Sequence, residues 1–98
     1  MFVILLRFAD NKSEAGNHMN DHNAWLKQGF DDGVFLAAGT LQPKQGGAIL
    51  AHAMNASELQ ERLHQDPFVE HGVVSTEILE IDPARVDSRL NFLVTQDS

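Results

Sequence analysis

The apolar run Phe2–Phe8 constrains the fold more than any other part of the sequence. In an extended backbone, successive side chains point to opposite faces. Both faces of this run are apolar, with Phe2, Ile4, Leu6 and Phe8 on one and Val3 and Leu5 on the other. Such a strand lies in the middle of a sheet that is covered on both sides. Arg7 interrupts the second face and has two interpretations, a snorkelling or ion-paired side chain and a contact with an anionic substrate.

The segment from His18 to Gly33 has the periodicity of an amphipathic helix. Steps of three and four residues bring five side chains onto one stripe, namely His22, Trp25, Leu26, Gly29 and Phe30. An imidazole inside an apolar stripe is unusual, and a buried imidazole needs a hydrogen-bond partner. Gly33 suits the left-handed residue that follows a helix C-terminus.

The start of this helix is left open by the sequence. Residues 9–17 are polar, contain a glycine and have no period, so we expect a loop there. Ser13, Asn17 and Asn20 are each possible N-cap residues.

The rest of the chain predicts three more strands and a second helix. The expected strands are Val34–Leu41, Ala48–Met54 and Val73–Ile81. Residues 42–47 contain a proline and paired glycines, which are typical of a hairpin loop. The second helix begins at Asn55 or Ser57 with a capping box, and it ends before Asp66 because the residue preceding a proline avoids helical backbone angles.

A short helix is expected in a C-terminal extension, residues 83–98. Pro83 suits the first turn of a helix after Asp82, and Val86, Leu90 and Leu93 then repeat at helical spacing. Residues 1–82 are expected to form the domain proper.

The order strand, helix, strand, strand, helix, strand predicts an α+β fold. It is the split βαβ pattern of ferredoxin-like domains, with a four-stranded antiparallel sheet and both helices on one face. The other face is then open, although the first strand is apolar on both sides. The sheet of a second subunit would cover it, so we expect a homodimer that packs through its sheet faces.

The composition excludes some classes of binding partner. The 98 residues suffice for one domain, and 14 acidic against 7 basic residues give a formal net charge of -7. Binding to nucleic acid or to an acidic membrane surface needs clustered cations, so neither is expected. The N-terminal apolar run is too short for a membrane span and lacks a signal-peptide cleavage site. We expect a cytoplasmic protein that binds small molecules.

Several short motifs together resemble one known family. They are the opening strand, His22-x-x-Trp25-Leu26, Gly33-x-Phe35-x-x-x-Gly39, Gly46-Gly47 and Asp66-Pro67-Phe68-x-x-x-Gly72. In this order and spacing they resemble the YciI-like (YCII-related) family from residue 1 to about residue 81. The resemblance implies a dimeric α/β barrel and an active site built on His22 and Asp66. It also implies a kinship with small isomerases, lyases and monooxygenases that act on aromatic or enol-like compounds.

A His-Asp dyad agrees with the chemistry of the two residues. A carboxylate that accepts a hydrogen bond from one imidazole nitrogen fixes the tautomer and raises the basicity of the other nitrogen. Two alternatives stay open: His22 could bond a backbone carbonyl in the core, and Asp66 could be a turn carboxylate bonded to its own backbone. Trp25, Phe35 and Phe68 either line a pocket for an aromatic substrate or belong to the core.

No metal or cofactor is predicted. His18 and His22 are four residues apart on a helix, but no third ligand follows at a recognisable spacing. The paired glycines do not open a helix, so a phosphate site is not indicated. We therefore expect a cofactor-independent lyase or isomerase in which His22 moves a proton and Arg7 steadies an oxyanion. The alternative is a non-catalytic small-ligand binding or accessory protein.

Overall fold

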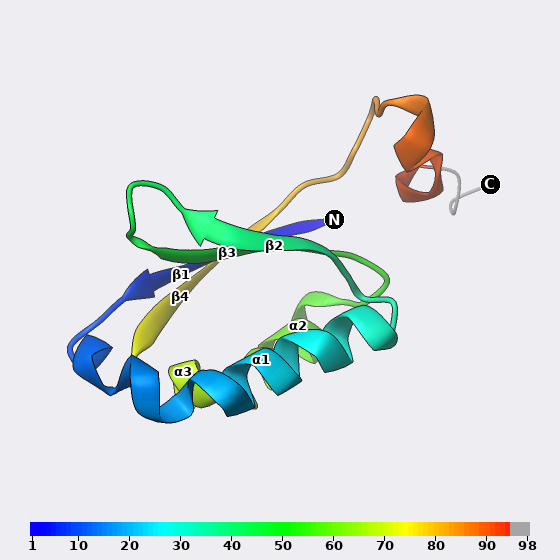
Figure 1. Cartoon of the computed structure of the whole chain (residues 1–98). Helices are drawn as coiled ribbons and strands as arrows, with labels where there is room; N and C mark the ends of the chain where they lie inside the picture. Colours follow the sequence, from blue (N-terminus) through cyan, green and yellow to red (C-terminus); the bar gives the residue numbers. More distant parts are fainter. Residues whose placement is uncertain (95–98) are drawn as a thin grey trace.

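The computed structural model describes residues 1–94, which form one sheet with helices on one side (Figure 1). The elements in chain order are β1 (Phe2–Phe8), the 3₁₀ helix η1 (Lys12–Glu14), α1 (Ala15–Asp31), β2 (Phe35–Leu41), β3 (Gly46–Ala51), α2 (Ala56–His64), α3 (Pro67–Glu70), β4 (Val74–Glu80) and the 3₁₀ helix η2 (Ser88–Leu93). The last part of the expected extension, residues 95–98, lies outside the described residues.

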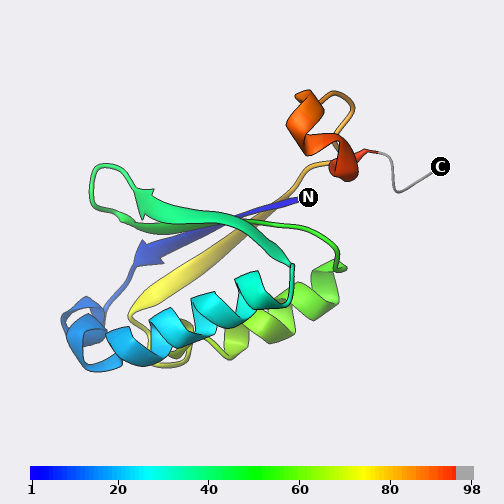
Figure 2. The same cartoon turned by 45° about the vertical axis from the view of Figure 1, so that its right-hand side comes forward.

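The sheet has four strands in the order β2-β3-β1-β4, and every neighbouring pair is antiparallel. The fold is therefore of the α+β class, with β1 in the interior of the sheet as its two apolar faces predict. Helices α1, α2 and α3 all lie below the same face in both views (Figure 1, Figure 2). Within residues 1–94, every helix falls short of the length and hydrophobicity of a membrane span.

The core lies between this sheet face and the helices. On β1 the inward side chains of Phe2, Ile4 and Leu6 are at most 3% exposed, whereas Val3 and Leu5 on the opposite face are only half-buried. The main partners of the inward side chains are Trp25, Phe35, Ile49, Leu59, Leu63, Phe68 and Val73.

Helix α1 begins earlier than its sequence signals indicate. It starts at Ala15 directly after η1, and its first turn receives no capping hydrogen bond from a side chain. None of Ser13, Asn17 and Asn20 is the N-cap, so the loop expected through residue 17 is wrong over its second half. The helix ends as predicted, with Gly33 in the left-handed region at φ 74°.

The hairpin between β2 and β3 is shorter than predicted. Gly46 and Gly47 belong to β3, where they pair with Arg7 and Leu6 of β1 rather than forming the loop. A side chain at Gly46 would place its Cβ 1.8 Å from the carbonyl oxygen of Leu6, so glycine is what allows β3 to lie this close. At the other end β3 stops at Ala51, because Ala53 turns the backbone to φ 62°.

The start of α2 is determined by its N-cap residue. Asn55 opens α2 with a complete capping box to Glu58, which decides between the two predicted starts. The helix ends at His64, before Asp66, as predicted. The next turn, α3, was not predicted.

The C-terminal segment differs from the helix expected after Asp82-Pro83. The helical part is a 3₁₀ helix that begins at Ser88, with Asp87 as its N-cap. Leu93 is 3% exposed, and the ring of Phe92 lies edge-on to His52 at 5.2 Å. The end of the described chain thus packs beside the residue that follows β3.

Candidate active site

His22 on α1 is hydrogen-bonded to Asp66, which lies between α2 and α3. The distance from His22 Nδ1 to Asp66 Oδ1 is 2.7 Å. The Asp66 side chain is fully buried, and that of His22 is 11% exposed. The structure therefore brings together the two residues that the sequence predicted, although they are 44 positions apart.

Asp66 is oriented by the turn that it caps. Its extended backbone precedes Pro67 at the start of α3, and its Oδ1 also accepts a hydrogen bond from the backbone N–H of Phe68 at 3.0 Å. The interpretation as a turn carboxylate and the interpretation as the partner of His22 are thus both correct. When Asp66 is ionised and the imidazole of His22 is neutral, Nδ1 donates to the carboxylate and Nε2 carries the lone pair.

The second oxygen of Asp66 has a different environment. Oδ2 is buried and has no hydrogen-bond partner among the described residues. A buried oxygen without a partner destabilises the folded chain.

Phe68 fixes the plane of the imidazole. Its ring stacks on that of His22 with centroids 4.0 Å apart and planes within 7°. The turn at Asp66 thus supplies both a hydrogen-bond acceptor for His22 and a flat apolar surface beneath its ring. These two contacts hold the imidazole in one orientation.

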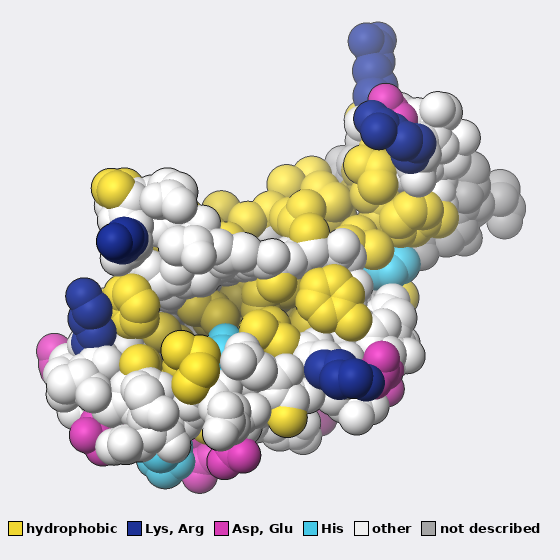
Figure 3. All heavy atoms as spheres, in the orientation of Figure 1, with side chains coloured by type: hydrophobic (Ala, Val, Ile, Leu, Met, Phe, Trp, Pro, Cys, Tyr) yellow, Lys and Arg dark blue, Asp and Glu magenta, His cyan; other side chains and the backbone are white. Residues whose placement is uncertain are grey.

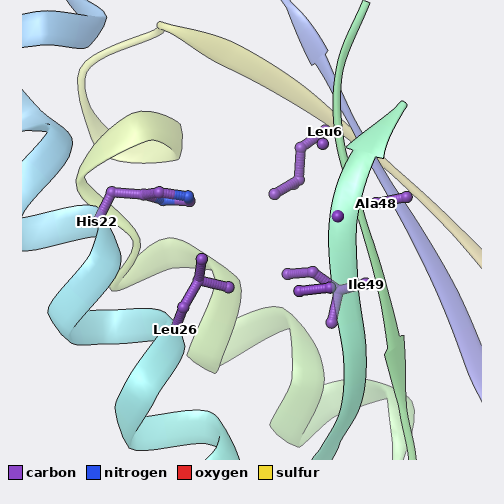
Figure 4. Close-up of a pocket in the computed structure, with 8 residues that line it drawn as sticks. Leu6, His22, Leu26, Ala48 and Ile49 are labelled. Atoms are coloured by element: carbon purple, nitrogen blue, oxygen red, sulfur yellow. The ribbon is translucent and has the colours of Figure 1, made fainter. Parts of the chain in front are cut away.

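His22 lies at the junction of two adjoining cavities between α1 and the sheet. One has a volume of about 180 Å³ and the other about 220 Å³. Both are lined by Leu6, His22, Gly39 and Gly47; Leu26, Ala38, Ala48 and Ile49 complete the first, and Phe8, Met19, Asn23, Thr40, Gly46, Phe68 and Val74 complete the second. Figure 3 shows hydrophobic side chains around this hollow, and in Figure 4 the His22 ring points from α1 towards the sheet and Leu6.

Small residues on two strands leave this space open. Ala38 and Gly39 of β2 face Ile49 and Ala48 of β3 across the ladder, and Gly47 follows at the same end of the sheet. Of these residues, Ala38 and Gly47 lie on the helix-facing side of the sheet, in register with the inward side chains of Ile49 and Leu6, so longer side chains at these two positions would fill the volume below the sheet. A gap beside a titratable group with one fixed orientation can hold a small ligand.

The other predicted binding residues separate into two groups. Phe68 lines the larger cavity, as predicted for a pocket residue. Trp25 and Phe35 belong to the core: they are 8% and 3% exposed, their rings meet edge-on at 5.3 Å, and Trp25 Nε1 donates to the carbonyl of Arg62. Neither lines either cavity.

Arg7 lies on the opposite face of the sheet from His22. It alternates with the inward residues of β1 and forms an ion pair with Glu77 of β4, and the two side chains are about half exposed. The interpretation as an ion pair is confirmed, and the structure does not bring Arg7 to the cavities.

Sequence reasoning missed several residues of the cavity wall. Met19 lies three residues before His22 on α1, Asn23 follows His22 directly, and both line the larger cavity. The helical spacing of Met19 from His22 was an available signal, whereas adjacent residues such as Asn23 do not share a helix face. Thr40, on the facing strand β2, had no such signal.

The second histidine of α1 has another partner. His18 stacks on His71, with ring centroids 4.0 Å apart. Within residues 1–94, no group of three or more His, Cys, Asp or Glu side chains is arranged to hold a metal ion.

Comparison with known proteins decides the family. Residues 1–82 match the family described as the YCII-related domain. The chain belongs to this family. The resemblance expected from the sequence motifs is thereby confirmed, and the match includes both members of the His22–Asp66 pair in this YCII-related domain. None of the curated proteins matches the chain.

A solved structure shares the fold of this YCII-related domain. It is 5-chloro-2-hydroxyhydroquinone dehydrochlorinase (TftG) from Burkholderia phenoliruptrix AC1100, in complex with 2,5-dihydroxybenzoquinone. The alignment covers 83% of this chain and 93% of that one, with a TM-score of 0.64 and 16% sequence identity. At this identity the likeness concerns the fold alone.

Proposed function

We propose that this YCII-related domain is an enzyme that transfers a proton on a small, hydroxylated cyclic or aromatic substrate. In this proposal His22 is the general base, Asp66 is its positioning residue, and the reaction is of the lyase or isomerase type. The supporting observation is that the imidazole of His22 both bonds Asp66, at 2.7 Å, and lines the two cavities.

The proton would follow a simple path. With Nδ1–H donated to Asp66, the lone pair on Nε2 accepts a proton from a substrate hydroxyl, or from a carbon next to a carbonyl. The buried carboxylate then stabilises the imidazolium, and Nε2 returns the proton to another substrate atom or to the leaving group. General acid–base catalysis of this kind contributes about 10² to 10⁴ to the rate.

The cavity walls favour a planar, largely apolar ligand. Within residues 1–94, His22 is the sole titratable side chain that lines either cavity, and Asn23 and Thr40 add polar groups. Phe8, Met19 and Phe68 supply apolar surface. The dehydrochlorinase that shares this fold was solved with 2,5-dihydroxybenzoquinone, a planar hydroxylated ring. A ring of this kind is the substrate class that we propose.

Solvent deuterium exchange tests the proposal directly. A panel of hydroxylated benzoquinones and cyclic 1,3-diketones in D₂O would be followed by proton NMR, with wild type, His22→Gln, Asp66→Asn and His52→Gln. We expect enzyme-dependent exchange to fall by about 10² to 10⁴ in His22→Gln and by less in Asp66→Asn. His52 lines neither cavity, so His52→Gln is the matched control and should equal wild type.

The same samples distinguish the non-catalytic alternative. Panel members that bind and shift the His22 ring signals, yet exchange no faster than with His22→Gln, would contradict the enzyme and support a binding protein. In that case His22→Gln should weaken binding only modestly, because one neutral hydrogen bond is lost.

We also propose that two copies associate through the open sheet face, as in a dimeric α/β barrel of ferredoxin-like units. No described helix covers that face (Figure 1), and its apolar side chains include Val3, Leu5, Leu50 and Leu79. Leu79 is 45% exposed in the single chain. Light scattering should give a dimer mass for wild type and a monomer mass for Leu50→Glu; a wild-type monomer would contradict this arrangement.

A further inference from the structure

Lys12 contacts a residue that lines the larger cavity. It is the first residue of η1, the turn that leads into α1 and so towards His22. Its Nζ lies over the ring of Phe8, 4.8 Å from the ring centroid. Phe8 lines the cavity of about 220 Å³ together with His22, so this ring connects the ammonium group to the candidate site.

Among residues 1–94, Lys12 differs from most lysine and arginine side chains in forming no salt bridge. The lysine and arginine side chains that form salt bridges within residues 1–94 are Arg7, Lys27, Arg62 and Arg89. The ammonium of Lys12 instead rests on an aromatic face, a contact that holds a cation without neutralising its charge. Its charge therefore remains free to act on a ligand.

The apolar rim of the larger cavity is exposed to solvent at two residues. Phe8 is 37% exposed and Met19 is 42% exposed, and both line the larger cavity. A flat ring could lie between these side chains with one end towards His22 and the other towards Lys12. In a chain with a formal net charge of -7, an anion is repelled unless a local cation offsets the field.

We propose that Lys12 is a specificity residue that binds an anionic group of the substrate, so that the substrate is a single planar ring bearing a carboxylate or an ionised hydroxyl. The inference rests on the proposed function, because it places the ring in the cavity that His22 lines. Phe8 acts as the platform for the ring and keeps the ammonium at the rim. The group that loses its proton then lies at the His22 end.

Two probes of nearly the same shape but different charge test this assignment. They are 2,5-dihydroxybenzoate and its neutral analogue 2,5-dihydroxybenzamide, titrated into ¹⁵N-labelled protein near neutral pH. We expect the acid to bind wild type about two- to fivefold more tightly than the amide, as befits a partly exposed charge pair. Added salt should reduce this preference.

Three variants separate charge from packing. Lys12→Met keeps the aliphatic stem but should bind acid and amide equally, whereas Lys12→Arg should retain the preference for the acid. Lys27→Met, which removes an exposed lysine of α1 that pairs with Asp31, should behave as wild type.

The opposite results are equally clear. An unchanged preference for the acid in Lys12→Met, or an equal loss for both probes, would overturn the role of Lys12. Binding of neither probe to wild type would overturn the proposed anionic ring. Both results leave the proton-transfer proposal standing, because that proposal depends on exchange that requires His22.

Discussion

Replacing Gly29 with alanine should destabilise the protein, because α1 packs closely against Phe35 of β2 at this residue. A Cβ at position 29 would lie 2.1 Å from Cδ2 and 2.3 Å from Cε2 of the Phe35 ring. Non-bonded carbons prefer separations of about 3.5 to 4.0 Å, so ring and helix would have to part by more than about 1 Å. Phe35 has little freedom to move, since it is 3% exposed and meets Trp25 edge-on.

The expected magnitude is a difference of two effects. Overpacking a core costs about 1 to 3 kcal/mol, and an overlap this deep belongs at the upper end. Alanine recovers up to about 1 kcal/mol through its better helix propensity. The free energy of unfolding should therefore fall by about 2 kcal/mol, which lowers Tm by roughly 10 °C for a domain of this size.

Thermal and urea unfolding would measure this change, with Gly16→Ala as the matched control. Gly16 lies on the same helix, and no heavy atom would come within 4 Å of its added Cβ. That variant should be as stable as wild type or more stable by up to about 1 kcal/mol. Combining Gly29→Ala with Phe35→Leu should give a smaller loss than the sum of the two single changes. Full stability of Gly29→Ala, or strict additivity in the cycle, would refute the close approach.

Three further changes test the caps, an ion pair and the strand contact. Asn55→Ala removes the capping box of α2 and should cost about 1 kcal/mol in urea unfolding; no loss would contradict the cap. The side-chain hydrogen bond from Arg62 lowers the pKa of Asp32 below 3.8, so the pair stabilises the fold above that pH and its contribution disappears as the pH falls through the lowered pKa. Arg62→Met should therefore lose stability near neutral pH, and the difference from wild type should shrink in acid unfolding experiments; a difference that grows in acid would contradict this sign. Gly46→Ala would drive a Cβ against the carbonyl oxygen of Leu6 at φ 137°, so it should lower Tm strongly or prevent folding. A wild-type melting curve for that variant would show that β1 and β3 lie further apart.

Much of the fold follows from local sequence signals. The double-sided apolar pattern of Phe2–Phe8 indicates an interior strand, and the structure has these same bounds. Asn55 and Pro67 mark helix boundaries because a cap and a proline restrict the backbone locally. Such signals lie within a few residues of the feature that they predict.

Features that depend on contacts with another part of the chain were harder to predict from the sequence. Gly46 and Gly47 have the composition of a turn, but their pairing with β1 makes them strand residues. Helix α1 starts at Ala15 without a side-chain cap, so no residue type marks its beginning. In both cases the decisive contacts come from outside the segment itself.

The candidate site was only partly predictable for the same reason. His22 was noticeable as an imidazole in an apolar stripe, and the family resemblance named Asp66. The stripe itself was less uniform than expected, since Phe30 is 43% exposed. The rotation of α1 about its own axis decides that Trp25 lies in the core and Met19 lines the cavity. The sequence pattern does not define this rotation precisely enough to assign individual residues.

The hydrogen-bonded pair His22–Asp66 and the cavity walls come from different layers of the fold. His22 and Asp66 belong to the helical layer, where the α3 turn holds them, whereas Ala38 and Gly47 are wall residues on the strands. A larger residue on a strand would reshape the space for a ligand without touching the hydrogen bond between the pair. If the proposed function holds, ligand selectivity can therefore change through small substitutions in β2 and β3 while the His22–Asp66 pair stays intact. For protein engineering, substitutions in β2 and β3 are therefore the way to alter the shape of the cavity without changing the His22–Asp66 pair in the helical layer.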